Sequence, residues 1–190
     1  MHPFTKYTRL LAASALVLAP TLAMTQPTAP TAAAARPAAR AEDVRSIEAI
    51  MGAIYDAISG SAGQERDWDR FRSLFLPGAR LIPTGRRASD SVGVARVWDV
   101  EEYIRVAGPG LKGGFFEREI GSRTDRYGSV VQRFSAYESR RALDDAKPFA
   151  RGVNSFQLFN DGKRWWVVTI YWEGESPSNP IPAEYLRTSP

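Results

Sequence analysis

Hydrophobic residues recur at helical spacing where the folded part of the chain begins. Between residues 43 and 59 an apolar position returns every three or four residues, which predicts an amphipathic helix that buries one stripe. Asp67 can cap a second, shorter helix. Asp99, followed by a glutamate three residues later, predicts a third helix over residues 99–107. The glycines and proline at 108–110 predict the end of that helix.

After residue 110 the pattern changes to long extended runs that are rich in aromatic and β-branched residues. The four runs are residues 115–127, 129–141, 150–160 and 163–173. Such runs, bounded by glycine and polar residues, are typical of strands joined as hairpins. Helices followed by consecutive strands predict an α+β domain.

Asp161-Gly162 predicts a two-residue hairpin turn between the last two strands. The register that follows from this turn pairs Asn154 with Thr169 and Arg151 with Trp172. Both faces of the paired strands are then largely apolar, and a sheet of this kind must be covered on both sides. Because the helices cover one face, we expect a homodimer that forms through the outer face.

The first 41 residues lack the pattern of a folded domain. Lys6 and Arg9 precede an apolar run, Leu10 to Leu22, which predicts a cleaved signal peptide over residues 1–23; a retained membrane anchor is the alternative. Residues 24–41 are nearly all Ala, Thr and Pro and predict a flexible linker. We therefore expect a periplasmic or secreted protein that is not held at the membrane after cleavage.

Charge argues against a nucleic-acid partner. The formal net charge is +4, but four basic residues and no acidic ones lie in residues 1–41, which leaves 21 basic residues against 21 acidic ones. Arg66, Arg70 and Arg72 are interleaved with acidic residues and predict a solvated helix face. Binding to a phosphate backbone needs clustered, uncompensated cations, so we expect no nucleic acid as a partner.

Histidine and cysteine are nearly absent. The chain has no cysteine, and its one histidine, His2, falls within the expected leader. The domain therefore offers no imidazole or thiolate for catalysis or metal binding. Because no glycine-rich phosphate loop or metal-ligand spacing is present either, we expect no cofactor and no metal. Any catalysis must use carboxylates, tyrosines or arginines.

The order of elements resembles that of the nuclear transport factor 2-like superfamily, which includes SnoaL-like proteins. Four segments look like those of an exported bacterial subgroup without assigned function: Phe116 to Glu119, Tyr137 to Arg140, Arg151 to Ser155, and Ile181 to Leu186. The resemblance covers residues 42–174 and implies a cone of three N-terminal helices on a curved antiparallel or mixed sheet. We expect the Pro-rich tail, residues 175–190, to pack on this domain.

The resemblance also implies a cavity between the sheet and the helices. Such folds host isomerases, dehydratases, cyclases, hydrolases and binding proteins, so the fold does not define the activity. Polar and aromatic residues on the apolar strands and the third helix are the candidate cavity residues: Tyr103, Glu119, Tyr137, Glu138, Arg151, Asn154 and Trp172. Each could instead form cross-strand pairs or pack in the core.

Three functions remain open at this point. The first is the binding of a small apolar or aromatic molecule without turnover. The second is a cofactor-independent isomerase, dehydratase or cyclase with Glu119 or Glu138 as the base and Tyr137 or Tyr103 as the acid. The third is a dimeric interaction module whose cavity is filled by its own side chains.

Overall fold

A computed structural model describes residues 36–87 and 92–187. The expected signal peptide, most of the expected linker and the last three residues of the tail lie outside these ranges. None of the helices in the described ranges is long and apolar enough to span a membrane.

The described residues contain four α-helices. They are α1 (Ala41–Val44), α2 (Ile47–Ile58), α3 (Trp68–Ser73) and α4 (Val100–Leu111). The first expected helix is split in two, because the Ser46 side chain accepts a hydrogen bond from the Ala49 amide at 3.1 Å and starts α2 afresh. Asp67 and Asp99 cap α3 and α4, as predicted.

Helix α4 continues through the residues that were expected to end it, and that prediction was wrong. Pro109 lies in the last turn, where the amide hydrogen that it lacks would have made only one helical bond. Gly108 lies against the indole of Trp68, and an added Cβ would come within 3.1 Å of that ring. Close packing on α3 and burial of Leu111 hold the helix together to its end.

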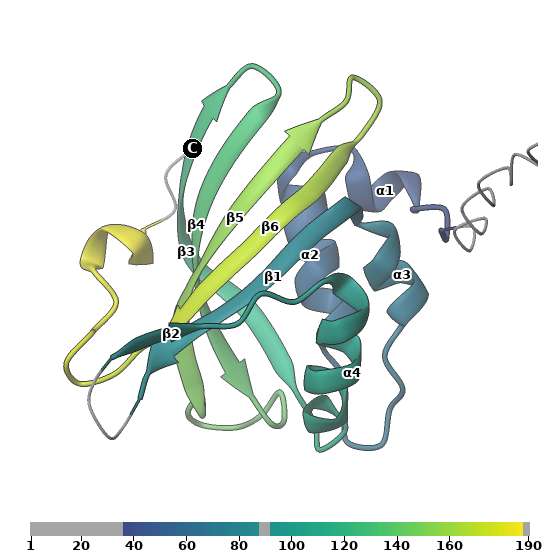
Figure 1. The fold of residues 1–190 in the computed structure, drawn as a ribbon. Coiled ribbons are helices and arrows are strands. Elements are labelled where there is room, and N and C mark those ends of the chain that lie inside the picture. Colours follow the sequence, from purple (N-terminus) through teal and green to yellow (C-terminus); the bar gives the residue numbers. More distant parts are fainter. Residues whose placement is uncertain (1–35, 88–91, 188–190) are drawn as a thin grey trace, which may run out of the picture. The chain divides into compact units, whose positions relative to one another are not determined.

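Six strands form one mixed sheet. They are β1 (Phe75–Arg86), β2 (Gly93–Ala95), β3 (Phe116–Tyr127), β4 (Val130–Arg140), β5 (Ala150–Asn160) and β6 (Trp165–Gly174). The order across the sheet is β2-β1-β6-β5-β4-β3, in which only the pairing of β1 with β6 is parallel. The helices gather on one face of the curved sheet (Figure 1), which confirms the predicted α+β fold class.

The β5–β6 register differs from the prediction. The loop contains four residues, 161–164, and Asn160 therefore pairs with Trp165. The Asp161 carboxylate organises this loop, since it accepts hydrogen bonds from the amides of residues 163 and 164 and from the Trp166 indole. A two-residue turn would leave these donors without their partner.

A bulge at Val168 shifts the register further. Leu158 pairs with Val167, whereas Gln157 pairs with Thr169, so one residue of β6 is left over. As a result Asn154 lies opposite Trp172 rather than Thr169. With this bulge, Ile170 and Trp172 rather than Thr169 and Tyr171 line the inner side of the sheet.

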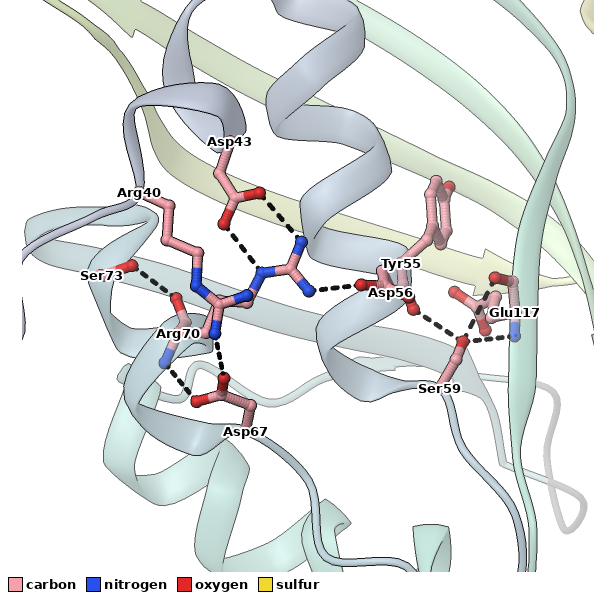
Figure 2. Close-up of polar contacts among 9 residues, drawn as sticks. All are labelled: Arg40, Asp43, Tyr55, Asp56, Ser59, Asp67, Arg70, Ser73 and Glu117. Atoms are coloured by element: carbon pink, nitrogen blue, oxygen red, sulfur yellow. Dashed lines mark hydrogen bonds and ion pairs between the residues drawn. The ribbon is translucent and has the colours of Figure 1, made fainter.

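The core lies between the helices and the inner face of the sheet. Its fully buried side chains come from α2, α3 and the strands, and include Ile50, Phe71, Leu74, Phe75, Phe156 and Val167. Arg70 ties the helices together, because its guanidinium binds both carboxylate oxygens of Asp43, at 2.8 and 2.9 Å, and also binds Asp56 (Figure 2).

Part of the outer face of the sheet is covered by the tail. A short 3-10 helix, η1 (Ala183–Leu186), places Tyr185 on Phe134 with ring centroids 5.0 Å apart. The Ser122 amide also donates to the carbonyl oxygen of Arg187 at 3.2 Å. The expected homodimer through this face remains a prediction.

Candidate functional site

Two hollows share Tyr55 and Glu117 as lining residues. The inner cavity, of about 240 Å³, lies between the inner face of the sheet and helices α2 to α4. Its aromatic lining includes Phe71, Tyr103, Phe115, Tyr137, Phe149, Phe156 and Trp172. The α2–β3 cleft, of about 790 Å³, is lined by α2, β3 and β4 and carries most of the charge.

Ser59 fixes the start of β3 to the end of α2. Its hydroxyl donates to the carbonyl oxygen of Tyr55 at 2.7 Å and accepts a hydrogen bond from the Glu117 amide at 3.0 Å (Figure 2). An isolated bridge between Gly60 and Phe115 continues this contact. The backbone of Glu117 is therefore held against α2 at the boundary between the two hollows.

Glu117 is half-buried, and the partners of its carboxylate are neutral. The Ser139 hydroxyl donates to its Oε2 at 2.8 Å, and the Asn154 amide also hydrogen-bonds to it. Among the described residues, no arginine or lysine forms an ion pair with Glu117. Burial raises the pKa of this carboxyl to about 7, although both hydrogen bonds oppose the shift. Glu117 lines both hollows.

Tyr103 and Tyr137 line the same inner cavity as Glu117. Neither hydroxyl has a hydrogen-bond partner in the described part of the chain. Burial, with the charge of Glu117 as the second cause, raises the pKa of both phenols, so both remain protonated donors at neutral pH. The Tyr103 ring is held rigidly, stacked on Phe71 at 5.3 Å and edge-on to Trp172 at 6.3 Å.

Asn154 connects Glu117 to a chain of hydroxyl groups. Its Nδ2 donates to Tyr55 Oη at 3.1 Å, and Tyr55 lies 2.6 Å from the Ser135 hydroxyl. Ser135 donates to Glu119 Oε2 at 2.5 Å, so Tyr55 must donate to Ser135. Each polar group in this chain therefore has a partner, which gives Asn154 a fixed orientation toward Glu117.

The other candidate residues lie elsewhere. Glu119 and Glu138 line the cleft rather than the inner cavity, and both are paired with arginines. Arg133 binds both carboxylate oxygens of Glu119, at 3.0 and 2.5 Å, while Glu138 binds Arg118 at 2.8 Å and Arg140 at 3.1 Å. Arg151 binds Glu175 at 3.1 Å and lines neither hollow. The predicted pairing of Arg151 with Trp172 was wrong, because Trp172 lies opposite Asn154.

Of the candidates, the inner cavity brings together Tyr103, Tyr137, Asn154 and Trp172. The sequence interpretation did not select Glu117, although a signal for it was present. Glu117 and Glu119 are two residues apart on one strand and therefore share a face. Over the described residues, no three His, Cys, Asp or Glu side chains converge as metal ligands would.

Known proteins resemble this chain in structure rather than in sequence. No protein-family model and no curated protein sequence matches it. A protein of unknown function with a cystatin-like fold from Nostoc punctiforme matches with a TM-score of 0.52 and 12% identity, over 72% of this chain and 92% of that one.

Two further solved structures have TM-scores of 0.43. One is an NTF2-like protein of unknown function from Methylobacillus flagellatus, at 13% identity over 69% of this chain and 95% of that one. The other, from Parabacteroides distasonis, is named "putative ketosteroid isomerase", at 14% identity over 69% of this chain and 89% of that one. Neither match carries an argument about the function of this chain. With its helices on one face of a curved six-stranded mixed sheet, the chain has the nuclear transport factor 2-like fold.

Proposed function

We propose that the inner cavity binds a small, largely apolar molecule and that Glu117 moves a proton on it. The observation that carries this proposal is a carboxylate on the wall of an aromatic cavity, beside two phenols; within residues 36–87 and 92–187 the carboxylate has no ion pair and the phenols have no hydrogen-bond partner. A carboxyl group with a pKa near neutrality is suited to take up and return a proton at physiological pH.

The cavity sets the size and polarity of the molecule. Its volume of about 240 Å³ equals that of about eight water molecules at about 30 Å³ each. Glu117 is the one charged side chain among the described residues that line it. A compact ring system with one or two oxygen atoms fits these walls, because aromatic side chains bind its faces while the phenols bind its oxygen.

The chemistry that fits is proton transfer next to a carbonyl group. Ionised Glu117 takes a proton from the carbon beside the carbonyl, and the electron pair moves onto the carbonyl oxygen as an enolate. The hydroxyls of Tyr103 and Tyr137 donate hydrogen bonds to that oxygen and stabilise the charge. Return of the proton to another carbon gives an isomer. If the β-carbon carries a hydroxyl, the electron pair of the enolate expels it, the protonated Glu117 gives its proton to the leaving oxygen, and water and a dehydrated product result.

The two alternative functions, a carrier and an interaction module, explain fewer features of the site. A carrier without turnover needs the cavity but gains nothing from a carboxylate that must be desolvated inside it. An interaction module with a filled cavity is disfavoured by the open volume. Export to the periplasm or medium, and dimerisation through the outer sheet face, remain proposals alongside this activity.

A proton-exchange assay tests the proposal. The small bicyclic ketone 1-indanone is incubated with the protein in D₂O, and loss of its α-proton signal is followed by proton NMR. We expect the protein to accelerate exchange, and Glu117→Gln to lower the rate by about 10²-fold or more. Glu48→Gln is the matched control, because Glu48 is exposed and lines the cleft alone, and this variant retains the cavity carboxylate. Exchange at the buffer rate with the wild-type protein, despite saturable binding of the ketone, would contradict catalysis and leave ligand binding.

A further inference from the structure

Glu117 can be reached from two sides. The residue lines the inner cavity together with Tyr103 and Tyr137, and it also lines the α2–β3 cleft together with Arg118 and Glu119. A ligand that fills the inner cavity therefore leaves the cleft, on whose wall Glu117 also lies, unoccupied.

The two hollows differ in chemistry. The walls of the inner cavity are aromatic and aliphatic apart from Glu117 and a few neutral polar groups. Among the described residues that line the cleft are five carboxylates, Glu48, Asp56, Glu117, Glu119 and Glu138, and three arginines, Arg118, Arg133 and Arg140. Such walls favour water, and their excess of negative charge favours hydrated cations, including the hydronium ion.

The cleft is open to solvent at its rim. The side chain of Arg118 is 70% exposed, Leu143 is 76% exposed, and Gly52 on α2 is exposed as well. Among the residues that line the inner cavity, Phe149 is 48% exposed and packs edge-on against Phe115 with ring centroids 6.1 Å apart. The exposed residues of the two hollows are therefore different ones.

We infer that Glu117 exchanges its proton with bulk water through the α2–β3 cleft while a ligand occupies the inner cavity. This inference rests on the proposed function. The carboxylate takes a proton from the ligand and becomes a carboxylic acid, which passes the proton to a water molecule in the cleft and becomes a carboxylate again. The reverse transfer supplies a proton for the product. Hydrogen removed from the ligand is thus replaced by hydrogen from the solvent.

Gly52 provides a means of closing the cleft without touching the cavity. It lies in the middle of α2 and lines the cleft, and an added Cβ would have no atom within 4 Å. A large side chain at this position would extend into the cleft rather than into the core. Gly110 on α4 is the matched control, since it is helical, exposed and equally open, but lines neither hollow.

Chemical labelling of Glu117 tests the access route without any turnover. The full-length protein is treated near pH 7 with a water-soluble carbodiimide and glycinamide, which modify protonated carboxyl groups, and peptide mass spectrometry measures modification of Glu117. Gly52→Trp should reduce this modification at least about 10-fold, and Gly110→Trp should leave it unchanged. Ala107→Trp, at a residue that lines the inner cavity alone, should also leave it unchanged. Gly52→Leu, a smaller substitution, gives a graded second variant.

The outcomes separate this inference from the proposed function. Modification that survives Gly52→Trp but is lost in Ala107→Trp would overturn the inference, as would a wild-type Glu117 that is not modified at all. If labelling follows the expected pattern while 1-indanone does not exchange, the access route stands and the proposed catalysis fails. If both hold, Gly52→Trp should slow indanone exchange at least about 10-fold with unchanged ketone affinity, and an unchanged exchange rate would overturn the inference.

Discussion

The phenol of Tyr137 lies directly against Gly152, its partner on the neighbouring strand. A Cβ at position 152 would lie 2.5 Å from Tyr137 Oη and 2.4 Å from the carbonyl oxygen of Glu173. Neither distance can be accommodated without a shift of the ring or the backbone. The absence of a side chain at Gly152 therefore makes room for one of the three phenols that line the inner cavity.

Gly152→Ala should displace Tyr137. We expect a loss of about 1–3 kcal/mol in the free energy of unfolding, as for other overpacked sites, together with weaker binding of 1-indanone. Urea unfolding and a ligand titration measure the two effects. Gly110→Ala is the control and should be neutral or stabilising by up to about 1 kcal/mol, because it adds a good helix former in open space. A Gly152→Ala protein with wild-type stability and affinity would contradict this account of the cavity wall.

Asn154→Leu should raise the pKa of Glu117. The amide donates to Glu117 and favours its charged form, so removal of the amide disfavours ionisation. The pH at which the indanone exchange rate is half-maximal should move upward. Gln132→Leu removes an amide that donates to Ser155 Oγ, outside the two hollows, and should not move it. An equal shift in both variants would mean that Asn154 acts on the fold as a whole.

Arg66 should contribute strongly to stability. Its guanidinium donates to the carbonyl oxygens of Ile58, Gly60 and Leu111, each at 2.8 Å, and thereby joins the C-terminal ends of α2 and α4. Arg66→Met leaves these buried oxygens without their donor and should lower the free energy of unfolding by about 2–4 kcal/mol. Arg72→Met, which breaks an ion pair with the exposed Glu101, should lower it by less than about 1 kcal/mol. Chemical denaturation of both variants checks the difference.

The burial of Glu117 should appear in the pH dependence of stability. Its pKa is raised from 4.5 to about 7 in the folded protein, so the folded state holds this proton more tightly than the unfolded state does. The resulting stabilisation is complete below the unfolded pKa and is lost as the pH rises through about 7. Since one pKa unit corresponds to about 1.4 kcal/mol, Glu117→Gln should gain up to about 3 kcal/mol over the wild-type protein between about pH 4.5 and pH 8. A stability difference that does not change with pH would argue against a buried, unpaired carboxyl.

The sequence predicts the elements of this fold well because each has a local signal. Asp67 and Asp99 cap helices, and the four extended runs became β3 to β6 within two residues at each end. The pairing register of the strands depends less on local sequence signals. The Val168 bulge has no side-chain signature, and the Asp161 carboxylate stabilises a four-residue loop that Asp161-Gly162 alone does not reveal. The contact of Gly108 with Trp68, which supports the end of α4, depends on tertiary packing as well.

Part of the site could also be predicted from the sequence. The placement of Tyr103, Tyr137 and Asn154 toward one cavity follows from the fold and from strand alternation. The choice between Glu117 and Glu119 depends on which carboxylate meets an arginine, and Arg133 reaches Glu119 from the neighbouring strand. The distance between Arg133 and Glu119 is set by the β3–β4 register and by a bulge after Glu119. The alternation of residues along the strand does not show either feature.

Direct titration of the Glu117 carboxyl group is the most decisive measurement. In protein labelled with ¹³C-glutamate, the carboxyl resonance that disappears in Glu117→Gln is followed from acidic to alkaline pH. The account predicts a midpoint near pH 7, as expected for a carboxyl buried between Ser139, Asn154 and aromatic walls without a cation. A midpoint near the ordinary value of 4.5 would contradict it, because Glu117 would then be solvated or paired and could not be the base of this cavity.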